Sequence, residues 1–299
     1  MMVSSVLADW HVAMERQLLA ENPTAAAALA QVVLQHFPRH LPTYQRLLRV
    51  AWALQRWEEG EDWGKRLLRA DPGNALAWRA LAMAAEQRGQ RAQAHATWQR
   101  ALEADPYAPL IRAGVSRTSL RPFDGGATRA GEEPAITLTL ACLATLYRRG
   151  LRWEQAAATY QLLLQAEPRR VDFQIGRLAA LWQQRARQTA YRMARQLTEQ
   201  HPHLLIAWVA LRSLGDDNDR ALARDPIDKL DPDGDFVSSW FGVHYDSQPV
   251  TLEVSTTEAE LLQKYLKESV VRSLDLGLRT QDSKLRTQDA MLRSTENKI

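Results

Sequence analysis

Apolar and small residues recur along the first two-thirds of the chain in blocks of about a dozen, at the three- to four-residue spacing of amphipathic helices. The stretch from Leu76 to Pro106 shows this most clearly, because Gly89 divides it into two such blocks. A single helix gains nothing from a central glycine, whereas two antiparallel helices need a reversal there. The pattern therefore predicts a helical hairpin.

The same pattern returns at a fixed interval. Pro38, Pro72 and Pro106 are 34 residues apart, as are Pro168 and Pro202. Each proline is placed to end a second helix, because proline lacks an N–H and restricts the residue before it. Reading back from the prolines gives five units, residues 7–40, 41–74, 75–108, 137–170 and 171–204. One unit cannot bury its apolar face alone, so the units are expected to stack.

The second half of each unit carries small residues in register, at Ala26, Gly60, Ala94, Ala156 and Ala190. With Trp78, Leu81, Trp98 and Pro106, this register resembles the tetratricopeptide repeat, whose pattern is W-x2-L-G-x2-Y, then A-x3-F, then P. The resemblance implies an all-α solenoid of helical hairpins, in which the first helices line an inner groove that binds other polypeptides. The last unit departs most, with Leu178 in a small slot and Ala194 in a large one.

Other parts of the chain lack the repeat. We expect three units over 7–108, a linker or loop over 109–136, and two units plus a capping helix over 137–215. Residues 216–256 are acidic and broken by prolines, which predicts an irregular segment. Its apolar Phe236, Val237, Trp240 and Phe241 indicate that it docks on something. Residues 257–299 are expected to form a helical or disordered tail, because the heptad leucines there lack a second apolar position.

Composition narrows the class of protein. Hydrophobic residues make up 45% and charged residues 24%, as in soluble globular proteins. The one cysteine, Cys142, leaves no disulfide framework and predicts a reducing, cytoplasmic setting. No apolar run approaches the ~18 residues of a membrane span, and the first residues lack the pattern of a secretory signal.

Catalytic motifs are lacking in the sequence. It contains no glycine-rich phosphate loop, nucleophile elbow or two-histidine metalloprotease helix. The acidic run from Asp231 to Asp235 resembles the start of a calcium loop, but Gly242 stands where the bidentate glutamate is needed. We expect no enzyme, no metal and no cofactor. The alternative is a targeting module of a larger enzyme complex, or catalytic residues within 216–299.

Tryptophan and arginine on the expected first helices mark the groove. Arginine donates paired hydrogen bonds to carboxylates, and tryptophan supplies apolar area. A groove of this chemistry would bind another protein or a peptide segment, possibly an acidic one. The alternative is that the linker or the tail half-covers these side chains. The candidate residues are Arg46, Arg49, Trp52, Arg79, Met83, Arg148 and Trp182.

A basic block offers a different function. Residues 137–204 contain ten arginines and four acidic residues, a local charge of +6. Such a surface could contact RNA or another polyanion. Protein binding is favoured over this alternative, because base-reading helical repeats need regular side-chain pairs that are not found here. The arginines that define the block are Arg148, Arg149, Arg152, Arg169, Arg170, Arg185 and Arg187.

Overall fold

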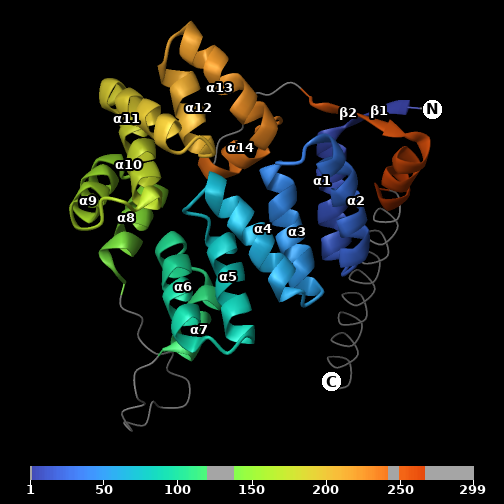
Figure 1. Ribbon diagram of the computed structural model, residues 1–299, viewed down its shortest axis with the longest axis horizontal. Coiled ribbons are helices and arrows are strands. Elements are labelled where there is room, and N and C mark those ends of the chain that lie inside the picture. Colours follow the sequence, from blue (N-terminus) through green and yellow to red (C-terminus); the bar gives the residue numbers. More distant parts are fainter. Residues whose placement is uncertain (1, 120–137, 242–248, 267–299) are drawn as a thin grey trace, which may run out of the picture. The chain divides into compact units, whose positions relative to one another are not determined.

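The computed structural model describes residues 2–119, 138–241 and 249–266 (Figure 1). The chain divides into two compact units, one of residues 1–32 and 249–299 and one of residues 33–248. We call them the terminal unit and the central unit. Helix α2 (Pro23–His36) begins in the first and ends in the second.

The terminal unit pairs the start of the chain with a late segment. Strand β1 (Met2–Val6) runs antiparallel to β2 (Thr251–Ser255), and α1 (Leu7–Leu19) follows β1 directly. After β2, residues 256–266 are helical. Glu258 starts this helix by accepting hydrogen bonds from the backbone N–H and the hydroxyl of Ser255, at 2.8 and 2.7 Å. Among the described residues these are the two strands, and β2 shows that residues 251–255 are not irregular, contrary to the expectation from the sequence.

The central unit is an array of tetratricopeptide-like helical hairpins, as the 34-residue pattern predicts. From α3 to α13, each helix packs against the next one along the chain, apart from the α7–α8 step, where α8 packs against α6; α14 (Asp235–Phe241) packs against α3. The hairpin helices are α3 (Leu41–Ala53) with α4 (Trp57–Ala70), α5 (Ala75–Gln87) with α6 (Arg91–Ala104), α8 (Leu140–Arg149) with α9 (Trp153–Ala166), α10 (Val171–Gln183) with α11 (Arg187–Gln200), and α12 (Leu205–Leu214) with α13 (Asp217–Leu230).

One left-handed residue closes the hairpin turn in each of the five units that the prolines define. Its φ lies between 55° and 69°, and the next residue donates its N–H to a carbonyl five residues back, as Gln90 does to Ala85 at 3.0 Å. Only one of these turns uses glycine, which adopts this conformation without strain. The turn residues in the five units are Glu21, Gln55, Gly89, Leu151 and Arg185.

The prolines between hairpins take part in a second repeated contact. After Pro38, Pro72, Pro168 and Pro202, the first-helix residue six positions later donates a side-chain hydrogen bond to the proline carbonyl, which thereby gains a hydrogen-bond partner. The distances are 2.8 Å for Trp78, 2.9 Å for Gln174 and 2.9 Å for Trp208, and the Tyr44 hydroxyl does the same. Gln174 therefore keeps the donor role of the aromatic residues that it replaces. The last unit also packs well, since Leu178 and Ala194 are fully buried.

Successive hairpins meet where a ring fits over a glycine. A Cβ placed on Gly176 of α10 would lie 2.4 Å from Cζ of Tyr160 on α9, and one on Gly114 would lie 2.4 Å from the Trp98 ring. The two rings are equivalent in the repeat, and so are the two glycines, each 16 residues after its ring. A large ring on a second helix thus requires glycine, which has no side chain, at the facing position of the next first helix.

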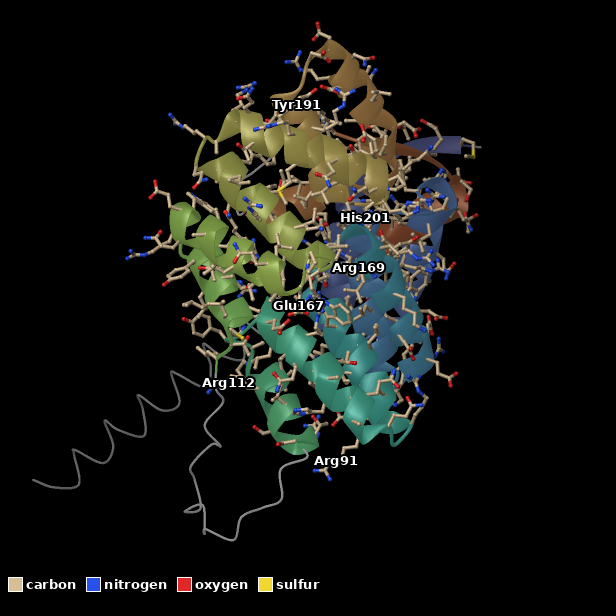
Figure 2. All side chains as sticks on the ribbon, turned by 60° about the vertical axis from the view of Figure 1, so that its left-hand side comes forward. Arg91, Arg112, Glu167, Arg169, Tyr191 and His201 are labelled. Atoms are coloured by element: carbon tan, nitrogen blue, oxygen red, sulfur yellow. The ribbon has the colours of Figure 1, made fainter. Side chains whose placement is uncertain are left out.

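Two expectations about the gaps in the pattern were wrong. Helix α7 (Pro109–Thr118) occupies the start of the expected linker, with Pro109 in its first turn and Gly114 against Trp98. Arg91, labelled in Figure 2, donates to the carbonyls of Thr118 and Ser119 at the end of α7. Residues 120–136 of that linker lie outside the described residues.

The expected capping helix is instead the first half of a sixth hairpin. Its second helix, α13, falls in the segment expected to be irregular. A capping box starts α13, in which Asp216 accepts from the Asp219 N–H at 2.9 Å and Asp219 accepts in return. A short helix, α14 (Asp235–Phe241), follows. Of the tail, residues 256–266 are helical and the rest lies outside the described residues.

Helix α8, the first helix after residues 120–137, packs against the end of α6. Thr145 of α8 donates to the Glu103 carbonyl at 2.7 Å, and Arg149 donates to the Ala104 carbonyl at 3.2 Å. These are among the last carbonyls of α6, which have no partner inside their own helix. Arg170, before α10, adds an ion pair to the Glu103 carboxylate at 2.7 Å. Together these contacts join the hairpins on the two sides of residues 120–137.

A buried carboxylate holds the start of α14. Asp231, 1% exposed, accepts hydrogen bonds from the N–H groups of Phe236 and Val237, both at 2.9 Å. Burial and the nearby charges of Asp233 and Asp235 raise the pKa of Asp231 from its ordinary value of 3.8 to about 7. Ionising this side chain therefore costs more in the folded chain than in the unfolded chain.

We predict opposite effects for two Gly→Ala changes in helices. Gly176→Ala forces a methyl group against the Tyr160 ring and should lower the free energy of unfolding by roughly 1–3 kcal/mol. The methyl group of Gly60→Ala would lie 3.6–3.8 Å from Ala51 and Trp52, which is ordinary contact. The higher helix propensity of alanine should therefore raise the free energy of unfolding by up to about 1 kcal/mol. Urea unfolding of both variants checks this, and shifts of the same sign would contradict it.

The raised pKa of Asp231 predicts a pH-dependent stability. A carboxyl whose pKa is raised in the folded state stabilises that state at low pH, and this contribution is lost as the pH rises from 3.8 through about 7. Asp231→Asn removes the titrating group, so the variant should gain stability relative to the parent between about pH 4 and about pH 8. Urea unfolding at both pH values measures this, with the exposed Asp228→Asn as control. If the free energies of unfolding of Asp231→Asn and the parent differ by the same amount at both pH values, the raised pKa of Asp231 is wrong.

Candidate functional site

Helix α14 lies across the first helices of several hairpins. Its Asp235 carboxylate lies 3.4 Å from Nη2 of Arg46 on α3. Its Trp240 ring lies 4.5 Å from the guanidinium carbon of Arg148 on α8. Its Phe241 ring meets Trp182 of α10 edge to face, with centroids 5.2 Å apart. The three contacted residues are all groove candidates, and they come together at one short helix.

The two halves of α14 are buried to different degrees. Phe236 and Val237, in its first turn, are 3% and 2% exposed and pack with apolar residues of α3, α12 and α13. Trp240 and Phe241, in its last turn, are half-buried, with ring centroids 4.7 Å apart. The first turn therefore belongs to the core, whereas the last turn covers the first helices without being enclosed.

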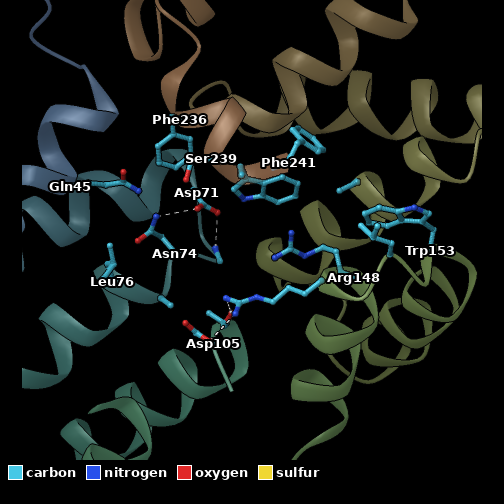
Figure 3. A pocket seen from close by; sticks show the side chains of 17 residues that line it. Gln45, Asp71, Asn74, Leu76, Asp105, Arg148, Trp153, Phe236, Ser239 and Phe241 are labelled. Atoms are coloured by element: carbon cyan, nitrogen blue, oxygen red, sulfur yellow. Dashed lines mark hydrogen bonds and ion pairs between the residues drawn. The ribbon is translucent and has the colours of Figure 1, made fainter. Parts of the chain in front are cut away.

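A hollow of about 450 Å³ opens beside α14, and we call it the central hollow. Figure 3 shows Asp71, Arg148 and Phe241 around it. It is bounded by the α4–α5 turn, the end of α6, the end of α8 and one side of α14. The side chains that line it include Gln45, Asp71, Asn74, Asp105, Arg148, Arg149, Trp153, Trp240 and Phe241.

The charges around the central hollow are unevenly matched. Arg149 pairs with Asp105, Nη1 to Oδ1, at 2.8 Å. Asp71 is 3% exposed and accepts hydrogen bonds from Asn74 and the Gly73 N–H, both at 3.2 Å; burial raises its pKa despite these bonds and the nearby charge of Arg148. The half-buried Arg148 makes no hydrogen bond or ion pair within residues 33–119 and 138–241. Its guanidinium is thus available to an incoming acceptor.

A second hollow, of about 420 Å³, lies between α5, α6 and α7, and we call it the α5–α7 hollow. Arg79 and Met83 line it together with Trp98, Leu110 and Arg117. The Arg79 guanidinium lies 4.0 Å from the Trp52 ring centroid, and burial lowers the pKa of Arg79. Arg79 Nε and Trp98 Nε1 are buried and have no acceptor among the described residues. An apolar group with a hydrogen-bond acceptor would suit this hollow.

The structure thus divides the groove candidates into two groups. Arg46, Arg148 and Trp182 contact α14, and Arg79 and Met83 line the α5–α7 hollow. Trp52 lies on α3 and stacks on Arg79, while Arg49 is half-buried on the same helix. All seven side chains are half-buried on first helices, where the repeat pattern placed them.

Sequence reasoning missed the residues that α14 brings to the site. Asp71 belongs to a hairpin connection, and Trp240 and Phe241 lie in a segment expected to be irregular. The available signal was the group of four apolar residues in an acidic context, which indicated docking but not the docking position. The apolar spacing from Phe236 to Trp240 and from Val237 to Phe241 is four residues, which a helix places on one face.

The basic block does not form one continuous cationic surface. Arg170 is paired with Glu103 and Asp172, both at 2.7 Å, and these pairs raise its pKa further. Arg149 is paired with Asp105, and Arg148 faces the central hollow. Arg169 and Arg187 remain exposed. Intramolecular pairing removes part of the positive charge that a polyanion would use.

No helix among the described residues is both long and apolar enough to cross a bilayer. No protein-family model matches the sequence, and no curated protein is similar to it.

The solved structures that this chain matches include that of Naa15/Naa10 bound to HypK-THB, in which the matched chain is 14% identical, with a TM-score of 0.30. The match covers 81% of this chain and 42% of that one, so this chain spans less than half of its length. A tetratricopeptide repeat protein from Parabacteroides merdae is 13% identical over 84% of this chain and 80% of its own, also with a TM-score of 0.30. The tetratricopeptide-like fold of this chain is defined by its own hairpins.

Proposed function

We propose that this chain is a non-catalytic scaffold that binds another protein through the first-helix face of its central unit. One observation carries the proposal: this face already holds a helical peptide, the α14 segment of the same chain. Residues chosen from the sequence as groove residues make the contacts, through an ion pair, a cation–π contact and an edge-to-face ring pair. A surface that binds one helix in this way has the chemistry to bind another.

The remaining features of the face support binding rather than catalysis. Rigid hairpins hold half-buried tryptophan and arginine, the residue types that dominate binding energy at protein interfaces. The available guanidinium of Arg148 and the unpaired Nε of Arg79 favour a partner with carboxylates. With its one cysteine, Cys142, buried as a free thiol, we also infer a reducing, cytoplasmic setting.

The alternative function, binding of RNA or another polyanion, is supported only by the exposed arginines on the α9–α11 side. It predicts retention on immobilised RNA that falls steeply as salt increases. The ion pairs of Arg149 and Arg170 weaken this alternative, and we favour a protein partner.

We predict that changes in the α5–α7 hollow release the partner. The full-length chain is used to capture partners from native lysate, and the double variant Arg79→Glu, Met83→Glu is compared with the parent. A partner held by this face should bind the variant at least ~10-fold less tightly, because a carboxylate replaces the cation and a charge enters an apolar contact.

Arg169→Glu, on an exposed side chain labelled in Figure 2, is the control and should keep the partner. Circular dichroism and urea unfolding establish that each variant remains folded. If a folded double variant retains every partner of the parent, the first-helix face is not the binding surface.

A further inference from the structure

The described part of helix α14, Asp235–Phe241, has seven residues, and an isolated helix of that length is marginal in water, where ~12 residues are needed. Its conformation therefore depends on what it touches. The first turn is fixed by the Asp231 carboxylate and by burial of Phe236 and Val237. The last turn is held by side-chain contacts: Trp240 to Arg148 and Asp71, Phe241 to Trp182, and both half-buried rings against the neighbouring apolar clusters.

Trp240 lines the central hollow and also a small neighbouring hollow of about 40 Å³, which reaches Tyr160 and Phe173. Asp71, Ala104 and Arg148 line both hollows as well. Because the two hollows share this lining, we describe them together as one slot across α5, α6, α8 and α10, with the Trp240 indole and the Arg148 guanidinium in its wall.

We propose that this slot is the docking site for a partner's amphipathic helix and that α14 is the in-chain occupant that such a helix displaces. The partner helix has the chemistry of α14: a carboxylate in its first turn for Arg46, and two aromatic side chains, five and six residues later, for Arg148 and Trp182. This inference rests on the proposed function and specifies its partner.

Charge complementarity supports this occupant. The segment from Asp231 to Asp235 carries three carboxylates and no basic residue, whereas the first helices present Arg46, Arg49, Arg79 and Arg148. A carboxylate in the first turn is also favoured by the helix dipole. The two aromatic rings fill the space over the cation and the indole, which a smaller side chain would leave open.

Because α14 occupies the slot, a partner must exceed a minimum affinity to bind there. A tethered segment acts at an effective concentration of the order of millimolar, so a free peptide of the same sequence competes poorly with it. A partner helix must add contacts outside the slot, for example in the α5–α7 hollow, to replace α14. Weakening the last turn of α14 should therefore strengthen binding of an external helix.

The test uses a fluorescein-labelled peptide of residues 231–241, DPDGDFVSSWF, and the full-length chain. Fluorescence anisotropy measures its affinity for the parent and for Trp240→Ala, Phe241→Ala. We expect at least ~10-fold tighter binding to the double variant, because its own α14 no longer fills the slot. Adding Arg148→Glu to the double variant should abolish the gain, and adding Arg169→Glu should not. A peptide with alanine at both aromatic positions should bind neither protein.

Asp235→Ala provides a milder variant, since this side chain is 47% exposed and its loss leaves the buried first turn in place. It should bind the peptide about 3-fold more tightly than the parent does, in the same direction as the double variant. It keeps the test decisive if the double variant does not fold.

Hydrogen exchange measured by mass spectrometry locates the binding. Excess peptide synthesised with 13C- and 15N-labelled residues, so that its fragments differ in mass from those of the chain, should increase deuterium uptake at residues 235–241 of the parent chain, because at about 1 mM it displaces part of α14. Three results would overturn the inference: the parent and the folded variants bind the peptide with equal affinity, none of them binds it at ~1 mM, or the peptide binds without a change in deuterium uptake at residues 235–241. Loss of the captured partner in Arg79→Glu, Met83→Glu would then still uphold the proposed function, so the two can fail separately.

Discussion

The close approach of successive hairpins is the constraint on which the rest of the central unit depends. At two equivalent seams a ring on a second helix, Trp98 or Tyr160, lies against a glycine on the next first helix. A methyl group at either glycine would separate the helices or force the ring out of its place. Because this contact recurs with the repeat, it sets the spacing of the first helices, and that spacing determines which side chains can share one ligand.

The site follows from this spacing. Arg46, Arg148 and Trp182 belong to three different hairpins, yet all three reach one seven-residue helix. The same array gives the central hollow its walls, with Asp71 from a hairpin connection and Arg148 from the end of α8. The candidate site is thus a property of the array and not of any single repeat unit.

The differences between expectation and structure have specific physical causes. Residues 109–118 contain Pro109 and Gly114, which disfavour a helix locally. However, Pro109 lies in the first turn, where its missing N–H costs nothing, and Gly114 is required by the Trp98 ring. Residues 217–230 contain Pro226 within the helix, yet the Asp216–Asp219 capping box starts the helix and the burial of Ala223 and Ile227 fixes it. In both segments tertiary contacts outweigh a local preference.

The repeat can be predicted from the amino-acid sequence alone. The 34-residue period, the hairpins, the helix-ending prolines and the first-helix positions of the candidate groove residues all follow from periodicity and from proline chemistry. These are local properties, since helix spacing and chain reversal depend on residues a few positions apart. The position of α14 over the first helices could be learned only from the folded chain. Its contacts join residues far apart in the sequence, such as Arg46 and Asp235, 189 positions apart, and no local pattern records which distant helix a short apolar segment will meet.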